Sequence, residues 1–129
     1  MILGLGIDLV EIARIERLLR ERPERAERFL ARCFTEGERS YCEARGSGRA
    51  ASYAARFAAK EAVMKALGAP PGVRFTDIEV ARGVGRPEVA LGGAAARAAE
   101  AQGVRRAHLT LTHDAGTAAA AVVLEGEVR

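Results

Sequence analysis

The sequence has no tryptophan, and aromatic residues make up only 5% of its 129 positions. It also lacks any uncharged apolar run of the roughly 18 to 20 residues that a membrane-spanning helix needs. The apolar start, residues 1–10, has no basic leader and contains Asp8, so it does not resemble a signal peptide. What remains is an ordinary globular composition, with 49% hydrophobic and 29% charged residues, and we expect a single domain over residues 1–129.

Cysteine is scarce as well. Cys33 and Cys42 are the only two, and they are not arranged in a CxxC or Cys/His ligand pattern. This excludes a disulfide framework and argues against a zinc site. We expect both to be reduced, partly buried thiols of a cytoplasmic protein.

Lysine is the rarer of the two strongly basic residues. Of 20 lysines and arginines only Lys60 and Lys65 are lysine, and they lie either side of Glu61. Their proximity is either chance or a sign that a compact ammonium group is needed there, as beside a phosphate. The net charge of +3 fits an anionic partner without identifying it.

The periodicity of apolar residues predicts an α+β fold. A buried strand is expected first, and Gly4 and Gly6 in it suggest close approach by another backbone. Thr35 and Glu38 form an N-cap signature for a later helix. We expect helices over residues 11–22, 23–33, 36–44, 49–67 and 94–102, and strands over residues 2–10, 75–80, 87–91, 107–114 and 118–124. This order predicts a mainly antiparallel sheet packed on a long central helix, with additional short helices.

Two acidic residues stand out by their surroundings. Asp8 lies in an apolar run, where a carboxylate is costly unless it is paired, binds a metal or caps the next helix. Glu61 lies on one helical stripe with Phe57 and Lys65 at a spacing of four. Glu61 and Lys65 therefore form either a partly buried pair or an ordinary surface ion pair.

Two carboxylates from separate elements, with cationic side chains nearby, suit the binding of Mg²⁺ and a polyphosphate. This pattern favours phosphoryl-type transfer. The sequence contains no GxxxxGK[ST] loop and no GxGxxG after a strand, so neither a P-loop nor a dinucleotide fold is supported.

His113 is the third candidate for chemistry. It shares a strand face with Leu109 and Leu111, so we expect it to point toward the core side at a strand end. There it is either a hydrogen-bonded core residue or a catalytic one.

Two segments of the sequence resemble the holo-[acyl-carrier-protein] synthase family, the small bacterial type of 4′-phosphopantetheinyl transferase. They are residues 6–15 (GIDLVEIARI) and residues 56–68 (RFAAKEAVMKALG). Supporting matches follow the family's order at residues 28–30, 34–35, 75–80, 85–87 and 109–114. The likeness covers nearly the whole chain, and the first two segments together are highly specific.

The resemblance implies transfer of the 4′-phosphopantetheine arm of coenzyme A to a serine of apo-acyl carrier protein, in support of fatty acid biosynthesis. The other product is adenosine 3′,5′-bisphosphate. By the same resemblance, Asp8 and Glu61 are the Mg²⁺ ligands and Lys65 lies near the pyrophosphate. The implied catalytic residues are Glu61, Lys65 and His113.

The resemblance also implies where the two substrates bind. Arg56, Lys65, His113 and Arg49 are expected to contact coenzyme A. Arg14, with help from Arg28, is expected to meet acidic residues of the carrier protein. The family assembles as a homotrimer with sites between subunits, which agrees with the alanine-rich, small-side-chain core of this chain.

Two loops depart from the family pattern. Residues 69–72 (APPG) replace a Thr-Gly-type loop after the long helix, and Arg45 and Arg49 stand where relatives often carry lysine.

Two rival interpretations remain. A small basic nucleic-acid-binding module would fit the charge, but interleaved aromatics and long basic runs are missing, so we expect no nucleic-acid partner and no membrane partner. A catalytically silent subunit is disfavoured by the presence of Asp8, Glu61 and Lys65 together.

Overall fold

The computed structural model describes residues 1–129, which form five strands, five α-helices and two short 3-10 turns. The strands are β1 (Ile2–Glu11), β2 (Ile78–Arg82), β3 (Pro87–Leu91), β4 (Val104–Asp114) and β5 (Thr117–Gly126). The helices are α1 (Ile12–Leu19), α2 (Pro23–Cys33), α3 (Glu36–Glu43), α4 (Arg49–Ala66) and α5 (Gly93–Gln102). The 3-10 turns are Gly46–Gly48 and Phe75–Asp77.

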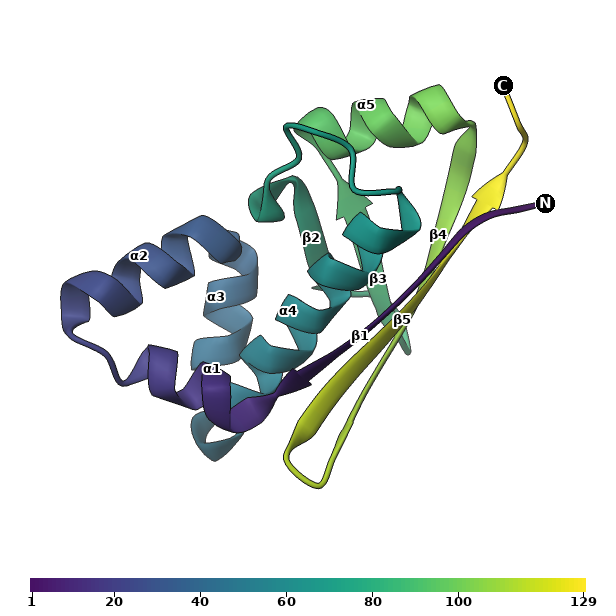
Figure 1. Ribbon diagram of the computed structural model, residues 1–129. Coiled ribbons are helices and arrows are strands. Elements are labelled where there is room, and N and C mark those ends of the chain that lie inside the picture. The colour runs from purple at the N-terminus through teal and green to yellow at the C-terminus, as the bar shows by residue number, and fades with distance from the viewer.

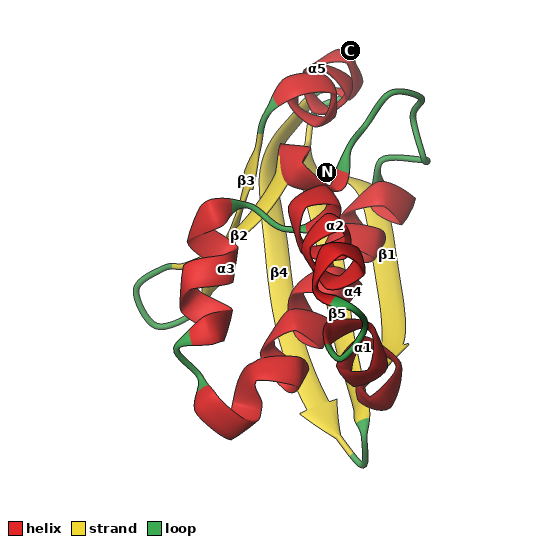
Figure 2. Cartoon of the chain, turned by 90° about the vertical axis from the view of Figure 1, so that its left-hand side faces the viewer, coloured by secondary structure: helices red, strands yellow, loops and turns green.

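The strands form two antiparallel sheets. One has three strands in the order β1-β5-β4, and the other is the hairpin β2-β3. Helices α1 to α4 all lie on one side of the three-stranded sheet, with the long helix α4 running directly across it (Figures 1 and 2). The predicted α+β fold, with a mainly antiparallel sheet on a long central helix, is confirmed.

Strand β1 and helix α4 approach each other at two glycines. A Cβ atom placed on Gly4 would lie 2.2 Å from the carbonyl oxygen of Ala66, and one on Gly6 would lie 1.8 Å from that of Ala62. No larger residue fits at either position without moving the backbone. The predicted close approach is confirmed, and it brings the end of β1 against the second half of α4.

Lys60 is fully buried and joins several elements to α4. Its Nζ atom lies 2.7 Å from Glu38 Oε1, donates to the carbonyl oxygen of Phe75 at 3.0 Å, and also donates to that of Ile78. Glu38 in turn accepts from the backbone N–H groups of Thr35 and Val80, and so completes the capping box predicted for α3. The interpretation of Lys60 as a phosphate-binding cation is therefore wrong, because its charge is used inside the fold.

Two predicted boundaries are also corrected. Residues 75–77 form a 3-10 turn rather than the start of a strand, because Asp77 Oδ2 accepts from the backbone N–H of Arg74 at 3.0 Å and closes a turn there. Helix α1 ends at Leu19 rather than near residue 22. Pro23 disfavours helical geometry in the residue before it, and Arg22 has a ψ of 142°.

The outer face of the three-stranded sheet carries uncovered apolar side chains. Leu5, Ile7 and Leu9 of β1 are 65 to 67% exposed, whereas Val10 on the inner face is buried. Helices α1 to α4 lie on the inner side (Figure 1). No helix of the chain is both long and apolar enough to cross a membrane.

Candidate active site

The first group of predicted site residues lies where β1 meets α4 and consists of Asp8, Glu61 and Lys65. We call it the carboxylate cluster. Lys65 Nζ lies 3.0 Å from Asp8 Oδ1 and donates to the carbonyl oxygen of Ile7 at the same distance. Lys65 thus pairs with Asp8 rather than with Glu61, so both forms of the predicted Glu61–Lys65 pair are wrong. Asp8 does not cap α1 either, since no side chain caps that helix.

The electrostatics of Glu61 show how close these charges are. Burial raises the pKa of Glu61, and the negative charge of Asp8 raises it further. The positive charges of Lys65 and Arg14 oppose this rise. Two carboxylates that repel each other across a partly buried gap would be stabilised by a divalent cation between them.

The donor set fits Mg²⁺ better than a transition metal. No group of three or more His, Cys, Asp or Glu side chains converges anywhere in the chain. Mg²⁺ uses one or two protein carboxylates and fills its remaining positions with water and substrate phosphates. Asp8 and Glu61 are therefore suited to hold Mg²⁺ together with a phosphorylated substrate.

The second group lines a hollow of about 250 Å³ between α3, α4 and the end of β4. We call it the anion pocket. Its charged and polar lining residues are Tyr41, Arg45, Ser52, Arg56, Thr112 and His113. The lining includes two arginines and no carboxylate, so the pocket favours an anionic ligand.

Arg56 is 5% exposed, although it carries a charge. Its Nη1 atom donates to Ser52 Oγ at 3.1 Å, and its guanidinium lies 4.1 Å from the centre of the Tyr41 ring. Its Nε atom is buried without any hydrogen-bond partner. A buried polar atom without a hydrogen-bond partner lowers the stability of the fold. Such an atom calls for an explanation, and a role in ligand binding is one.

His113 pairs with Ala118 of β5, whose side chain is buried on the inner face, so the prediction that His113 points to that face is confirmed. It lines the anion pocket beside Leu111. It is exposed and makes no hydrogen bond within the chain, so the alternative of a hydrogen-bonded core histidine is wrong.

Arg49 does not line the anion pocket. It lies 2.8 Å from Glu43 Oε1 and stacks on Tyr53, while Arg45 takes a place in the lining. Tyr41 was missed by the sequence analysis, because one tyrosine in an ordinary short helix gives no signal of a site.

The carboxylate cluster and the anion pocket lie at opposite edges of the three-stranded sheet. Strand β5 separates β1 from β4, and Asp8 and Leu111 both pair with Ala120 from opposite sides. Because neighbouring strands lie about 5 Å apart, β1 and β4 are about 10 Å from each other. Helix α4 runs over the sheet between the two groups (Figure 2). A single chain therefore does not gather all the predicted site residues in one cleft.

The two arginines predicted to meet a partner are both on the helical side of the molecule. Arg14 is exposed on α1, close enough to Glu61 for its charge to oppose the rise in the pKa of that carboxyl group. Arg28 is exposed on α2 and forms no ion pair. Both charges are free to meet an acidic surface.

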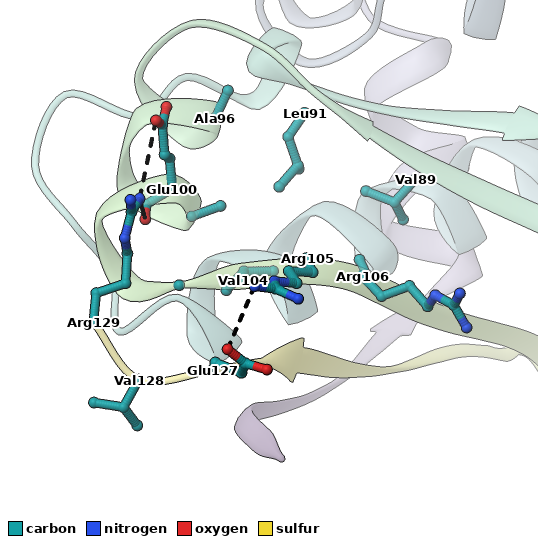
Figure 3. Close-up of a pocket in the computed structure, with 13 residues that line it drawn as sticks. Val89, Leu91, Ala96, Glu100, Val104, Arg105, Arg106, Glu127, Val128 and Arg129 are labelled. Atoms are coloured by element: carbon teal, nitrogen blue, oxygen red, sulfur yellow. Dashed lines mark hydrogen bonds and ion pairs between the residues drawn. The ribbon is translucent and has the colours of Figure 1, made fainter.

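A separate hollow of about 540 Å³ lies at the end of the molecule that holds α5 and both termini (Figures 1 and 3). Its rim carries the ion pairs Arg105–Glu127, at 3.4 Å, and Arg129–Glu100, at 4.0 Å. Its lining contains no histidine, cysteine, serine or lysine and none of the predicted site residues. It therefore offers no group suited to the predicted chemistry.

Comparison with known proteins decides the family. Residues 4–122 match the 4′-phosphopantetheinyl transferase superfamily. The chain is 64% identical over 126 residues to the holo-[acyl-carrier-protein] synthase of Anaeromyxobacter dehalogenans, covering 98% of each chain. This chain belongs to the holo-[acyl-carrier-protein] synthase family.

Solved structures of holo-[acyl-carrier-protein] synthases agree with this assignment. The protein from Neisseria meningitidis is 34% identical, with a TM-score of 0.81 and coverage of 97% of this chain and 99% of its own. The Helicobacter pylori protein, solved in complex with coenzyme A, is 31% identical, with a TM-score of 0.78 and coverage of 94% and 99%. The family and the fold predicted from the sequence are thus confirmed, and the chain is a phosphopantetheinyl transferase.

Proposed function

We propose that this chain transfers the 4′-phosphopantetheine arm of coenzyme A to a serine of apo-acyl carrier protein, in the cytoplasm and in support of fatty acid biosynthesis. The observation that carries the proposal is the carboxylate cluster. The chain belongs to this family, and its fold places Lys65 Nζ of α4 3.0 Å from Asp8 Oδ1 of β1. Glu61 lies close enough to feel both charges.

Each part of the cluster has a chemical use in this reaction. The serine oxygen bonds to the phosphorus that carries the pantetheine arm, the bond from that phosphorus to the bridging oxygen breaks, and adenosine 3′,5′-bisphosphate leaves as the serine loses its proton. Asp8 and Glu61 would hold Mg²⁺, which when bound offsets negative charge on the diphosphate. Lys65 supplies a further positive charge beside it.

The ribose of coenzyme A carries a 3′-phosphate in addition to the 5′-diphosphate, and the chain offers a positive site for this 3′-phosphate. Arg56 and His113 line the anion pocket, which contains no carboxylate to repel a phosphate. We extend the proposal to Arg49, which lies on the same side of α4 but would have to release Glu43 to reach a ligand.

We further propose that the chain is a homotrimer and that each site is completed by a neighbouring copy. Two observations support this. The carboxylate cluster and the anion pocket lie at opposite sheet edges, and the outer face of the sheet exposes Leu5, Ile7 and Leu9. Rotation about an axis facing that apolar side buries it and sets the β1 edge of one copy beside the β4 edge of the next.

The carrier protein is proposed to dock on the helical side. Arg14 lies close to Glu61, so an acidic partner that pairs with Arg14 would deliver its serine next to the carboxylate cluster. Arg28, which is exposed on α2 and has no ion pair, is proposed to assist Arg14.

Mass spectrometry of apo-acyl carrier protein incubated with this protein, coenzyme A and Mg²⁺ tests the proposed function. We expect the carrier protein to gain the mass of one phosphopantetheine arm, and we expect Glu61→Gln to lose most of this activity. Arg97→Gln, which removes one exposed, unpaired charge on α5 outside every proposed site, serves as the matched control and should keep full activity. A carrier protein of unchanged mass, or full activity in Glu61→Gln, would contradict the proposal.

A further inference from the structure

Three guanidinium groups surround the ring of Tyr41, which lies on α3 at the mouth of the anion pocket. Their central carbons are 4.1 Å (Arg56), 5.3 Å (Arg45) and 5.8 Å (Arg82) from the ring centre. Arg82 also donates from Nη1 to the Tyr41 hydroxyl at 2.9 Å. The three arginines come from α4, from the loop after α3 and from β2, so Tyr41 is the one group they share.

None of these three arginines is paired with a carboxylate. Three like charges at this separation repel each other, and the negative face of an aromatic ring is what offsets that repulsion. The same positive charges act on the phenol, because the hydrogen bond from Arg82 and the charges of Arg45 and Arg56 lower the pKa of Tyr41.

We propose that Tyr41 is a positioning residue for coenzyme A: its ring fixes Arg45 and Arg56 at the wall of the anion pocket, and its hydroxyl brings in Arg82 as a third cation. This rests on the proposed function. Arg56 depends most on the ring, since Ser52 is its only hydrogen-bonding neighbour and its Nε atom has none. Cations held in place before the ligand arrives lower the cost of ordering them on binding.

The ring and the hydroxyl have separable effects. Tyr41→Leu removes both, whereas Tyr41→Phe keeps the ring and releases Arg82. If the hydroxyl acts only through Arg82, then Arg82→Gln and Tyr41→Phe weaken the same contact, and the double variant is no worse than either single one. Arg97→Gln removes an exposed, unpaired arginine on α5 and is the matched control for loss of one positive charge.

Steady-state kinetics with coenzyme A and apo-acyl carrier protein, together with calorimetric titration of adenosine 3′,5′-bisphosphate, test the proposal. For Tyr41→Leu we expect the KM for coenzyme A and the Kd for the bisphosphate to rise about tenfold, as for the loss of several partly desolvated cation–π contacts. We expect kcat and the KM for the carrier protein to stay within about twofold of the unaltered protein, because Tyr41 contacts neither the carboxylate cluster nor Arg14, the residue proposed to meet the carrier protein. Tyr41→Phe should raise the same two constants about threefold, and Arg97→Gln should change neither.

An unchanged KM for coenzyme A in Tyr41→Leu, or equal changes in the constants for both substrates, would overturn the positioning role. If Tyr41→Leu fails to fold, Tyr41→Phe and the double variant Tyr41→Phe/Arg82→Gln still test the proposal. The proposal is contradicted if neither single variant weakens coenzyme A binding. It is also contradicted if the effects of the two single variants add up in the double variant. Failure of the unaltered protein to transfer the arm would overturn the proposed function as well, whereas normal transfer with unaffected Tyr41 variants overturns the positioning role alone.

Discussion

Lys65 joins β1 to α4 by donating to Asp8 Oδ1 and to the backbone carbonyl of Ile7, each at 3.0 Å. Its side chain is 54% exposed, so the ammonium group is tied to the strand end and still open to solvent. The position suits a cation that neutralises Asp8 in the free protein and is available to a diphosphate in the complex.

Lys65→Met is expected to reduce kcat/KM for arm transfer by about 10²- to 10³-fold, since it removes the charge that we propose acts on the leaving group. Stability should change by less than about 1 kcal/mol, because the pair with Asp8 is solvent-exposed on the lysine side. Kinetics and urea unfolding of the same variant measure both effects. A loss of activity matched by a loss of folded protein would mean that Lys65 is structural.

Lys60 is predicted to behave in the opposite way. Lys60→Met leaves the buried carboxylate of Glu38 without its cation and should lower the free energy of unfolding by about 3–5 kcal/mol. Urea unfolding monitored by circular dichroism gives this value, with Lys65→Met as the control on the same helix. A loss below 1 kcal/mol in Lys60→Met would contradict the structural role.

Gly6 should tolerate no side chain. The Cβ atom of Gly6→Ala would lie 1.8 Å from the carbonyl oxygen of Ala62, so β1 must move away from α4, at a cost of about 1–3 kcal/mol or more. Because β1 carries Asp8, we also expect transfer activity to fall more than stability alone explains. Gly92→Ala is the matched control, since the nearest atom to its added Cβ is 3.9 Å away and Gly92 lies outside every proposed site. Equal thermal midpoints for the two variants would refute the close approach.

The two thiols should make stability depend on alkaline pH. Burial raises the pKa of both Cys33 and Cys42 in the folded chain. An unfolded thiol ionises near its ordinary pKa of about 8.5, so above that pH the unfolded state binds fewer protons and is favoured. The stabilising contribution is complete below that value and is lost as pH rises through the higher folded pKa.

Urea unfolding between pH 7 and 10 measures this contribution when the chain is compared with the Cys33→Ala/Cys42→Ala variant, which lacks both thiols. We expect the difference in unfolding free energy between the two proteins to shrink as pH rises. Alkylation by iodoacetamide at pH 8 should be slow in the folded chain and fast in urea. A constant difference, or rapid alkylation of the folded chain, would show that the thiols are accessible.

The sequence was sufficient for most of the fold because its signals are local. Thr35 and Glu38 mark a helix start by their spacing, and Gly4 and Gly6 are small where a backbone must pass. The error at residues 75–77 arose because Asp77 closes a turn with a neighbour three positions back, while the apolar pattern there resembles a strand.

The site was only partly predictable, because the spacing of residues along a helix does not reveal ion pairs with side chains of other elements. Lys65 is four residues from Glu61, yet it bonds to Asp8, since the glycines of β1 bring that strand within reach. Lys60 lies next to Glu61 in sequence but points the other way, into the fold. The cluster of arginines around Tyr41 joins three elements, and no local pattern predicts it.

A site that two copies share is the central proposal for this enzyme, and mixing two inactive variants tests it directly. Glu61→Gln removes a carboxylate from the carboxylate cluster, and His113→Ala removes the imidazole from the anion pocket at the other sheet edge. When equal amounts are unfolded together and refolded, random assembly gives about one site in four with both halves intact, if the interface joins unlike surfaces of neighbouring copies. We predict recovery of about a quarter of the unaltered transfer rate, whereas a mixture no more active than the separate variants would show that each chain carries its whole site.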